Sequence, residues 1–135
     1  MLYDEINVGD SASVAKTISE SDIYNFAGIT GDFNPIHINQ KYAEGSRFGK
    51  RIAHGMLCAG LFSTIFAMKL PGEGAIYISQ DLQFTAPVFI GDTIEATAAV
   101  VEKLEKGKIK FDCVAVNQDG TAVIKGAAVL LVPRG

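Results

Sequence analysis

The sequence is poor in the residues that usually build metal centres and disulfide frameworks. Its 135 residues include two cysteines, two histidines and no tryptophan. Cys58 and Cys113 are too few for a disulfide framework and do not form a CxxC pair. Because the histidines lie in different segments, no Cys/His zinc cluster can be recognised. The sequence therefore predicts no metal site, and it favours a reducing, cytoplasmic location.

Excess charge and membrane-length apolar segments are missing as well. The net charge of −3 gives no reason to expect a nucleic acid as partner. The first ten residues, MLYDEINVGD, carry acids where a secretory signal would carry basic residues and an apolar core. The apolar residues 56–68 would span about 20 Å as a helix, which is short of the roughly 30 Å core of a bilayer. We expect one globular domain over residues 1–135, with no membrane partner.

Residue periodicity predicts helices mainly in the first half of the chain and strands in the second. Residues 11–18 alternate as a short strand, and either Ser19 or Ser21 can cap the helix that follows. Gly28 and Gly31 are expected to end that helix. Residues 39–46 form a second short helix, and residues 56–68, apolar on nearly every face, predict a helix buried in a core. Further strands are expected at residues 75–88, 92–104, 108–118 and 122–132, with turn signals at Gly91-Asp92, Lys106-Gly107 and Asp119-Gly120.

The order of these elements predicts the architecture. Consecutive strands with tight connections favour an antiparallel meander, because parallel neighbours would need crossovers of a dozen or more residues. The economical arrangement curls this sheet around the apolar helix, so that both hydrophobic faces are buried against each other. The predicted fold class is therefore α+β, with an antiparallel β-sheet wrapped around a long central apolar helix, the architecture called a hot dog fold.

The segment GDFNPIH, residues 31–37, places an acid and a histidine five positions apart. On a helix these residues would lie about 140° apart, and on a strand they would face opposite sides. Only a loop is expected to bring Asp32 and His37 together. A pair with this spacing is not rare, with an expected number of about 0.2 for this composition. The residues alone fit equally well a structural turn, with Asp32 capping it, Asn34 in an Asx-turn and His37 at the edge of the core.

The sequence GDFNPIHINQKYAEGSRFGKRIAHGML, residues 31–57, resembles the hydratase signature of the MaoC-like family. The likeness is greatest to the small (R)-specific enoyl-CoA hydratases that supply monomers for polyhydroxyalkanoate synthesis. It continues through LFS at residues 61–63, LPGEGAIYISQDLQF and APVFIGDT. The resemblance implies reversible addition of water to a trans-2-enoyl-CoA by a homodimer or higher homo-oligomer, with no cofactor beyond the CoA of the substrate. The site residues it implies are catalytic Asp32 and His37, oxyanion-binding Gly55, and supporting Asn34 and Ser63.

The chemistry of hydration suits these residue types. A base must take a proton from water, an acid must deliver one to C2, and a donor must hold the charge on the thioester oxygen. Asp32 and His37 can share the two proton transfers, and the sequence leaves open which residue does which. Gly55 opens the apolar helix, where N–H groups lack intrahelical partners and glycine permits close approach of a ligand.

Arg47, Lys50 and Arg51 form a basic stretch before the apolar helix. Such a stretch is usually a solvated loop, but here it is placed to meet the phosphates of CoA or the phosphopantetheine of an acyl carrier protein. Cys58 is expected to be inert packing, and His54 a structural residue at the helix start.

Two other functions fit the same residues. A base beside a thioester-polarising helix would also serve a thioesterase, either by direct hydrolysis or with Ser63 as a nucleophile and His37 as its base. No G-x-S-x-G elbow surrounds Ser63, which disfavours the covalent route. The third reading is a non-catalytic acyl-CoA binding subunit, which would not require the Asp32–His37 pair.

Overall fold

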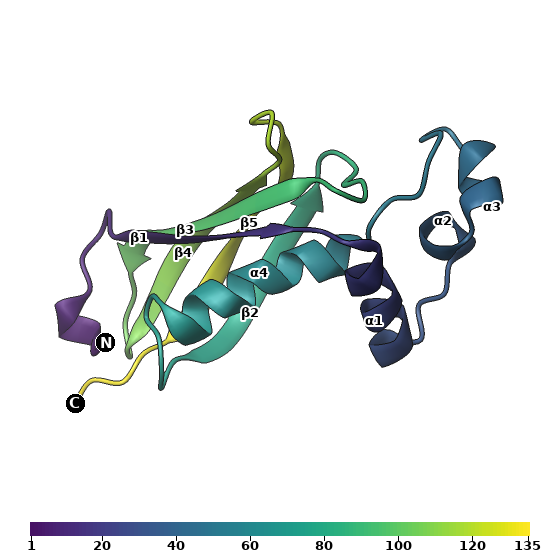
Figure 1. Ribbon diagram of the computed structural model, residues 1–135. Helices are drawn as coiled ribbons and strands as arrows, with labels where there is room; N and C mark the ends of the chain where they lie inside the picture. The colour runs from purple at the N-terminus through teal and green to yellow at the C-terminus, as the bar shows by residue number, and fades with distance from the viewer.

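A central helix, α4 (Gly55–Met68), crosses one face of a five-stranded antiparallel sheet in the computed structural model, which describes residues 1–135 (Figure 1). Shorter helices gather at one end of α4, and the two termini lie at the other end (Figure 1). The predicted hot dog fold is confirmed. The elements are the 3-10 helix η1 (Tyr3–Glu5), helices α1 (Glu20–Thr30), α2 (Pro35–Ile38) and α3 (Gln40–Glu44), and strands β1 (Ser11–Thr17), β2 (Ile76–Phe84), β3 (Thr93–Lys103), β4 (Lys108–Val116) and β5 (Ala122–Leu131).

The strand order is β1-β3-β4-β5-β2, with every pair antiparallel. The predicted meander is correct for β3, β4 and β5, which are joined by tight turns with positive φ at Gly107 and Gly120. It is wrong for β2, which pairs with β5 at an edge of the sheet rather than with β3. Residues 85–92 carry the chain from that edge to β3. A connection of this length does not hold β2 and β3 side by side as a tight turn would. The strand that pairs with β2 is therefore decided by tertiary packing.

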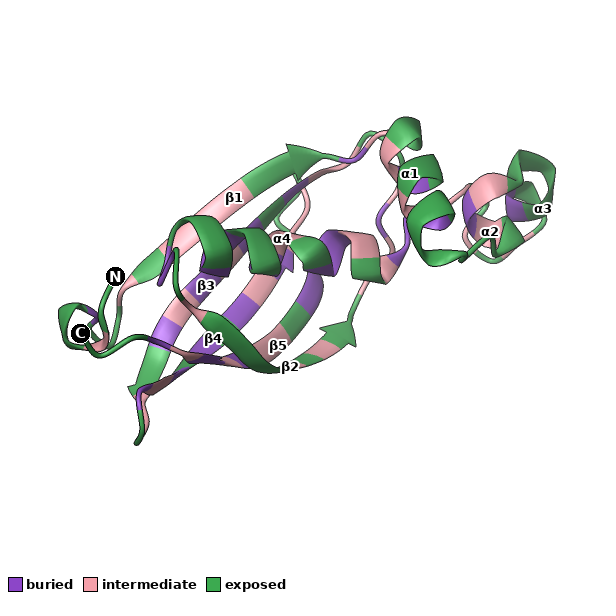
Figure 2. Cartoon of the chain, turned by 90° about the horizontal axis from the view of Figure 1, so that it is seen from below, coloured by how far each residue is buried: buried purple, intermediate pink, exposed green.

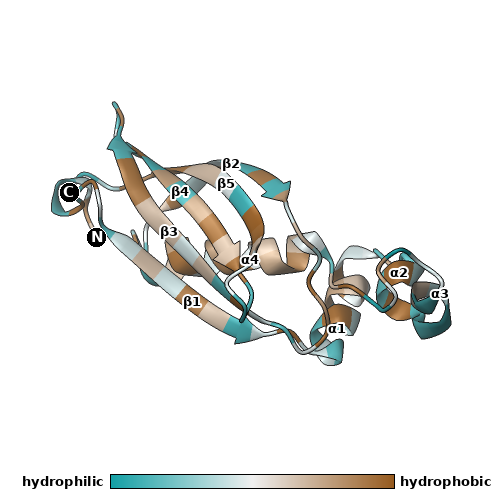
Figure 3. Cartoon of the chain, turned by 90° about the horizontal axis from the view of Figure 1, so that it is seen from above, coloured by the Kyte–Doolittle hydropathy of each residue, from teal (hydrophilic) through white to brown (hydrophobic).

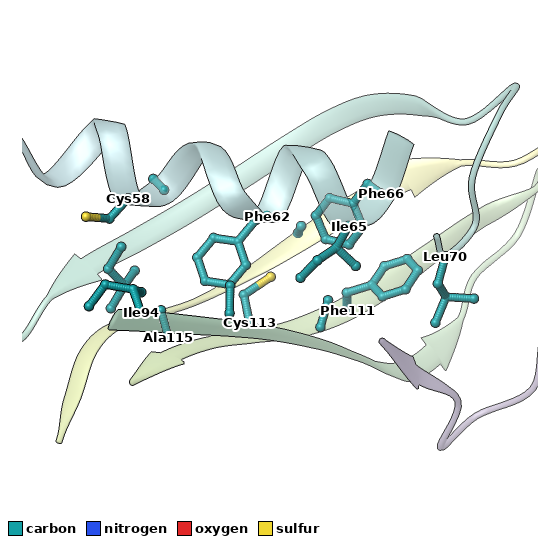
Figure 4. Packing of buried hydrophobic residues seen from close by; sticks show 14 of the residues in the cluster. Cys58, Phe62, Ile65, Phe66, Leu70, Ile94, Phe111, Cys113 and Ala115 are labelled. Carbon is teal, nitrogen blue, oxygen red and sulfur yellow. The ribbon is translucent and has the colours of Figure 1, made fainter. Parts of the chain in front are cut away.

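The core lies between α4 and the concave face of the sheet. Phe62, Ile65 and Phe66 of α4 are at most 2% exposed and point toward the strands (Figure 4). Phe66 meets Phe111 of β4 with ring centroids 4.8 Å apart. Alternate residues of the strands complete the core, among them Ile94, Ala96, Ala98 and Val100 of β3 and Ile109, Phe111, Cys113 and Ala115 of β4.

Only one face of α4 is buried. Met56 is 57% exposed and Met68 is 77% exposed. Exposed segments run along the helix in Figure 2, although Figure 3 shows hydrophobic residues along it. The expectation that α4 is buried on nearly every face is therefore wrong for the single chain, because the sheet covers one side of the helix and no element covers the other. No helix combines the length and the apolar character needed to cross a membrane.

Helix α1 begins at the first of its two predicted caps. The Ser19 hydroxyl accepts a hydrogen bond from the Asp22 N–H at 3.1 Å, and the Asp22 carboxylate accepts one from the Ser19 N–H at 2.9 Å. This reciprocal pair satisfies two N–H groups at the helix start. Gly31, in the left-handed region at φ 80°, ends the helix. The helix therefore delivers the chain to residue 32 in a defined direction.

Candidate active site

The segment after α1 is held by a series of short-range hydrogen bonds. The Asp32 N–H donates to the Thr30 hydroxyl at 3.2 Å. The Asp32 carboxylate accepts from the Asn34 N–H at 3.2 Å, and the Asn34 side-chain oxygen accepts from the Ile36 N–H at 3.2 Å. Asn34 is therefore the N-cap of α2. These bonds fix the backbone that carries the Asp32 carboxylate, while leaving that side chain exposed.

His37 lies on a turn of helix rather than on the predicted loop. Pro35 occupies the first turn of α2, where its missing N–H costs no hydrogen bond. The single turn of α2 folds the chain back on the segment that precedes it. Asp32 in the loop and His37 in the helix can then face one hollow, although a continuous helix would separate them.

The His37 ring is buried and held by one main-chain contact. Its Nδ1 lies 2.7 Å from the carbonyl oxygen of Ile52. A carbonyl oxygen only accepts, so Nδ1 carries the proton and Nε2 keeps the lone pair. Burial lowers the pKa of His37 below its ordinary 6.5, and the nearness of His54 acts in the same direction. His37 is thus set up as a neutral ring with a basic nitrogen.

Gly55 is the first residue of α4, and no side chain caps this helix. The Leu57 N–H donates to the His54 carbonyl at 3.1 Å, whereas the first N–H groups of a helix have no partner one turn back. The helix dipole makes this end attractive to negative charge. The ring of Phe84, from the end of β2, lies directly over Gly55, so close that a Cβ added there would be 2.6 Å from two ring carbons. A side chain at position 55 would therefore displace either the Phe84 ring or the helix start.

Two hollows meet at these residues. The catalytic hollow, of about 360 Å³, is lined by Asp32, His37 and Gly55 together with His54. The apolar cavity, of about 440 Å³, is lined mostly by hydrophobic residues and shares His37 and Gly55 with the first. His37 and Gly55 therefore lie at the boundary between the two hollows, with exposed Asp32 on one side and the apolar cavity on the other. The structure brings together the three residues that the sequence nominated for the chemistry.

Ser63 does not line the hollow that contains Asp32 and His37. It is exposed on the outer face of α4 and lines a separate hollow with Tyr77 and Gln80. It lies eight positions after Gly55, which is about 12 Å along a helix. Within one chain, Ser63 is therefore not beside His37, and a Ser63–His37 nucleophile pair is not formed.

The three predicted phosphate-binding cations have different surroundings. Arg47 is exposed and lines the apolar cavity, and Lys50 is exposed with its Nζ 4.3 Å from the centre of the Phe89 ring. Arg51 pairs instead with Glu20 and donates to the Tyr24 hydroxyl at 2.9 Å. These contacts hold the Arg51 guanidinium as a tie to α1, so its predicted phosphate contact gains no support from the structure.

Asp32, His37 and His54 are the set of side chains nearest to a metal-binding arrangement. Their ligating atoms lie within 4.8 Å of one another. The two imidazole rings are stacked, however, with centroids 3.9 Å apart and planes 26° apart. The lone pair of an imidazole nitrogen lies in the plane of its ring, and two stacked rings do not direct such lone pairs at one ion about 2 Å from both nitrogens. The arrangement fits proton transfer better than coordination.

Cys58 also lines the apolar cavity, one turn into α4. Burial raises the pKa of its thiol to about 12. A thiol at such a pKa carries almost no thiolate at neutral pH, which disfavours a cysteine nucleophile. This agrees with the prediction that Cys58 is packing.

Several contributors to the site have no local sequence signal. The Ile52 carbonyl and the Phe84 ring act through contacts with segments that only folding brings close. His54, expected to be structural, is buried against both Asp32 and His37. The only sequence feature that indicates a role for His54 in the site is its position directly before Gly55, the first residue of α4.

The chain is similar to several known proteins in sequence and in fold. Residues 6–122 match the family described as MaoC like domain. The chain is 49% identical over 131 residues to an (R)-specific enoyl-CoA hydratase of Rhodospirillum rubrum, covering 97% of this chain and 91% of that protein. Among solved structures, the unliganded (R)-hydratase PhaJ1 of Pseudomonas aeruginosa is 40% identical with a TM-score of 0.94, covering 99% of this chain and 86% of that one. The (R)-hydratase of Aeromonas caviae, described as involved in PHA biosynthesis, is 35% identical with a TM-score of 0.92, covering 95% and 98%.

Proposed function

Because this chain belongs to the MaoC-like family, we propose that it is an (R)-specific enoyl-CoA hydratase, a hydro-lyase that adds water reversibly to trans-2-enoyl-CoA. The product is the (R)-3-hydroxyacyl-CoA. The observation that carries this proposal is the catalytic hollow, in which a carboxylate, a neutral imidazole and an uncapped helix start line one space. The reaction uses no cofactor beyond the CoA of the substrate.

The proposed mechanism begins with one water between Asp32 and His37. The lone pair on His37 Nε2 and the Asp32 carboxylate can each accept one of its protons. As one O–H bond breaks, the water oxygen bonds to C3 and its proton passes to one of these two residues. The π electrons of C2=C3 move toward the thioester. The same pair then returns a proton to C2, so that atoms and charge balance.

The thioester oxygen gathers negative charge midway through this sequence. The Gly55 N–H, at the positive end of α4, is the donor we assign to it. The acyl thioester then lies at the boundary of the two hollows, with C3 toward Asp32 and the remainder of the substrate along the apolar cavity.

The direct test follows the reaction of crotonyl-CoA. We expect the ultraviolet absorbance of the enoyl thioester to fall without release of free thiol. Thiol release would instead identify a thioesterase, and binding with neither change would identify a binding subunit. The product should resist oxidation by an (S)-specific 3-hydroxyacyl-CoA dehydrogenase, because that enzyme takes the other enantiomer.

Variants connect the activity to the residues. Asp32→Asn and His37→Gln should each retain the fold and lose hydration by about 10²–10⁴-fold or more. Asp4→Asn is the matched control, because Asp4 is an exposed acid of η1, close to the N-terminus, and the N-terminus lies at the end of the molecule away from α1, α2 and α3 (Figure 1). Near-normal activity in either site variant would exclude this catalytic pair.

We also propose that the protein is a homodimer joined along β2 and the exposed face of α4. β2 is an edge strand with unpaired main-chain groups, and both elements carry exposed apolar residues. Met68 of α4 is 77% exposed, while Ile76, Ile78 and Phe84 of β2 are 57%, 46% and 51% exposed. A second copy related by a two-fold axis would cover these surfaces and remove the edge.

The dimer has its own matched pair of variants. Ile78 on β2 and Val101 on β3 are each 46% exposed, and each lies at an irregularity in its strand. Ile78→Glu should shift the mass measured by light scattering from dimer to monomer, whereas Val101→Glu should leave the dimer intact. A monomeric mass for the unaltered protein would refute the proposal.

For the CoA moiety, we propose Arg47 and Lys50 as the phosphate contacts, since both are exposed and Arg47 lines the apolar cavity. The same cations would meet the phosphopantetheine of an acyl carrier protein.

We place the reaction in the cytoplasm and, by likeness to the A. caviae enzyme, propose that its product feeds polyhydroxyalkanoate synthesis. Loss of polymer on deletion of the gene, with the protein in the soluble cell fraction, would support both points.

A further inference from the structure

His54 is the one buried side chain of the catalytic hollow to which the proposed mechanism gives no task. It is 2% exposed and immediately precedes α4. Residues at this position commonly cap the helix with their side chain, yet the His54 side chain makes no capping bond. Its ring is directed instead toward the two catalytic residues.

The first contact of His54 is with the main chain of Asp32. Its Nε2 lies 2.9 Å from the Asp32 carbonyl oxygen, across 22 positions of sequence. Because a carbonyl oxygen only accepts, the proton of this ring is on Nε2. Its Nδ1 is buried and has no hydrogen-bond partner. His54 and His37 therefore hold their protons on opposite nitrogens, since His37 donates from Nδ1 to Ile52.

The second contact of His54 is with the ring of His37. The two rings stack with centroids 3.9 Å apart. His54 also meets Phe26 of α1, with centroids 4.7 Å apart and planes tilted by 53°. The Ile52 carbonyl fixes His37 at one nitrogen, and His54 supports the ring against rotation away from the hollow.

We propose that His54 is the positioning residue of the hydratase site: its Nε2–H holds the main chain of Asp32 while its face holds the ring of His37. One side chain then sets the relative placement of the two groups that share the water. This inference rests on the proposed hydratase function. His54 is not assigned a catalytic role, because its protonated nitrogen is bonded to a carbonyl and its other nitrogen is buried.

Two variants separate the two contacts. His54→Phe keeps an aromatic face and removes the donor, whereas His54→Gln keeps an amide donor near the Nε2 position and removes the face. A misplacement of about 1 Å at a catalytic group costs about 10²-fold in rate. We expect His54→Phe to lower kcat on crotonyl-CoA by about 10²-fold with KM changed by no more than about twofold. His54→Gln should recover at least about tenfold of that loss, because it restores the bond to Asp32.

A role in packing alone predicts the reverse order. Phe fills the space of the ring better than Gln, so a purely structural His54 would leave His54→Phe with normal kcat and harm His54→Gln more. That result would overturn the proposal, as would a change confined to KM. Circular dichroism and thermal denaturation of each variant show that kcat is measured on folded protein.

A measurement on the unaltered protein keeps the proposal testable if neither variant folds. The chain has two histidines, so an ¹⁵N-histidine NMR spectrum contains two ring systems. We expect one ring protonated at Nδ1, for His37, and one at Nε2, for His54, with His37→Gln identifying the first. A His54 proton on Nδ1 would mean that the bond to Asp32 is absent, and the proposal would fail. This outcome is separate from the proposed function, whose failure would appear as absence of hydration in the unaltered protein.

Discussion

Replacing Gly55 with alanine tests whether the start of α4 must stay open to the substrate. The Cβ would lie 2.6 Å from two ring carbons of Phe84, whereas carbons in contact are about 3.5–4.0 Å apart. The overlap is therefore about 1 Å, and either the Phe84 ring or the helix start must move by roughly that distance.

The two ways of relieving this overlap have different kinetic results. If the helix start moves, the Gly55 N–H is displaced from the thioester oxygen and kcat should fall by about 10²-fold. If the ring moves, the apolar cavity that it lines changes shape and KM should rise. Because Phe84 is 51% exposed and can yield, the loss of unfolding free energy should stay near the lower end of the usual range of about 1–3 kcal/mol for overpacking.

The assay is steady-state hydration of crotonyl-CoA together with thermal denaturation. Gly28→Ala is the matched control, because Gly28 lies inside α1 and a Cβ added there would have no neighbour within 4 Å. It should keep normal kinetics and gain up to about 1 kcal/mol from better helix propensity. The double variant Gly55→Ala/Phe84→Ala should recover activity if the overlap is the cause. Normal kcat and KM in Gly55→Ala would refute the assigned role of the helix start.

Further predictions concern charge, substrate binding and stability. Because burial lowers the pKa of His37 below 6.5, the folded protein binds this proton more weakly than the unfolded chain does. Activity should therefore be complete above pH 6.5 and fall as pH drops through the lowered pKa, whereas the stability contribution should be complete above pH 6.5 and be lost as pH falls from there through the lowered pKa. An acid limb of kcat/KM at or above pH 6.5, or an equal acid loss of Tm in His37→Gln, would contradict this. Joint Arg47→Ala and Lys50→Ala should raise KM for enoyl-CoA and not for the pantetheine thioester, and equal losses on both substrates would exclude phosphate contacts. Ser19→Ala should cost about 1 kcal/mol in urea unfolding and Ser21→Ala close to none, and equal costs would show that the cap is not Ser19 alone.

Most secondary structure can be predicted because it follows from local residue patterns. The strand alternation, the apolar segment of α4 and the cap at Ser19 act within a few positions of the chain. The pair Asp32 and His37 is recognisable through the family signature of residues 31–57, because the residues of the pair alone fit a structural turn equally well. The one-turn helix α2 escapes prediction because four residues are too few to show a helical period.

The surroundings of the site are predicted less well. The sequence suggests Arg51 as a phosphate contact and Ser63 as a neighbour of His37. In the structure, Arg51 pairs with Glu20, and Ser63 lines a hollow with Tyr77. Both of these contacts join segments that are distant in sequence. The family resemblance identifies residue types and their order along the chain. It does not determine the face of the helix on which each residue lies in a single chain.

The sequence by itself determined most of the elements and the fold class, because these follow from composition and spacing over short stretches, and its resemblance to a known family nominated Asp32, His37 and Gly55. Only the tertiary structure decided that β2 pairs with β5, that the Ile52 carbonyl selects the lone-pair nitrogen of His37, and that His54 joins Asp32 to His37. These features depend on which surfaces pack together when the sheet closes on α4, and that choice is made by the whole core rather than by any one segment.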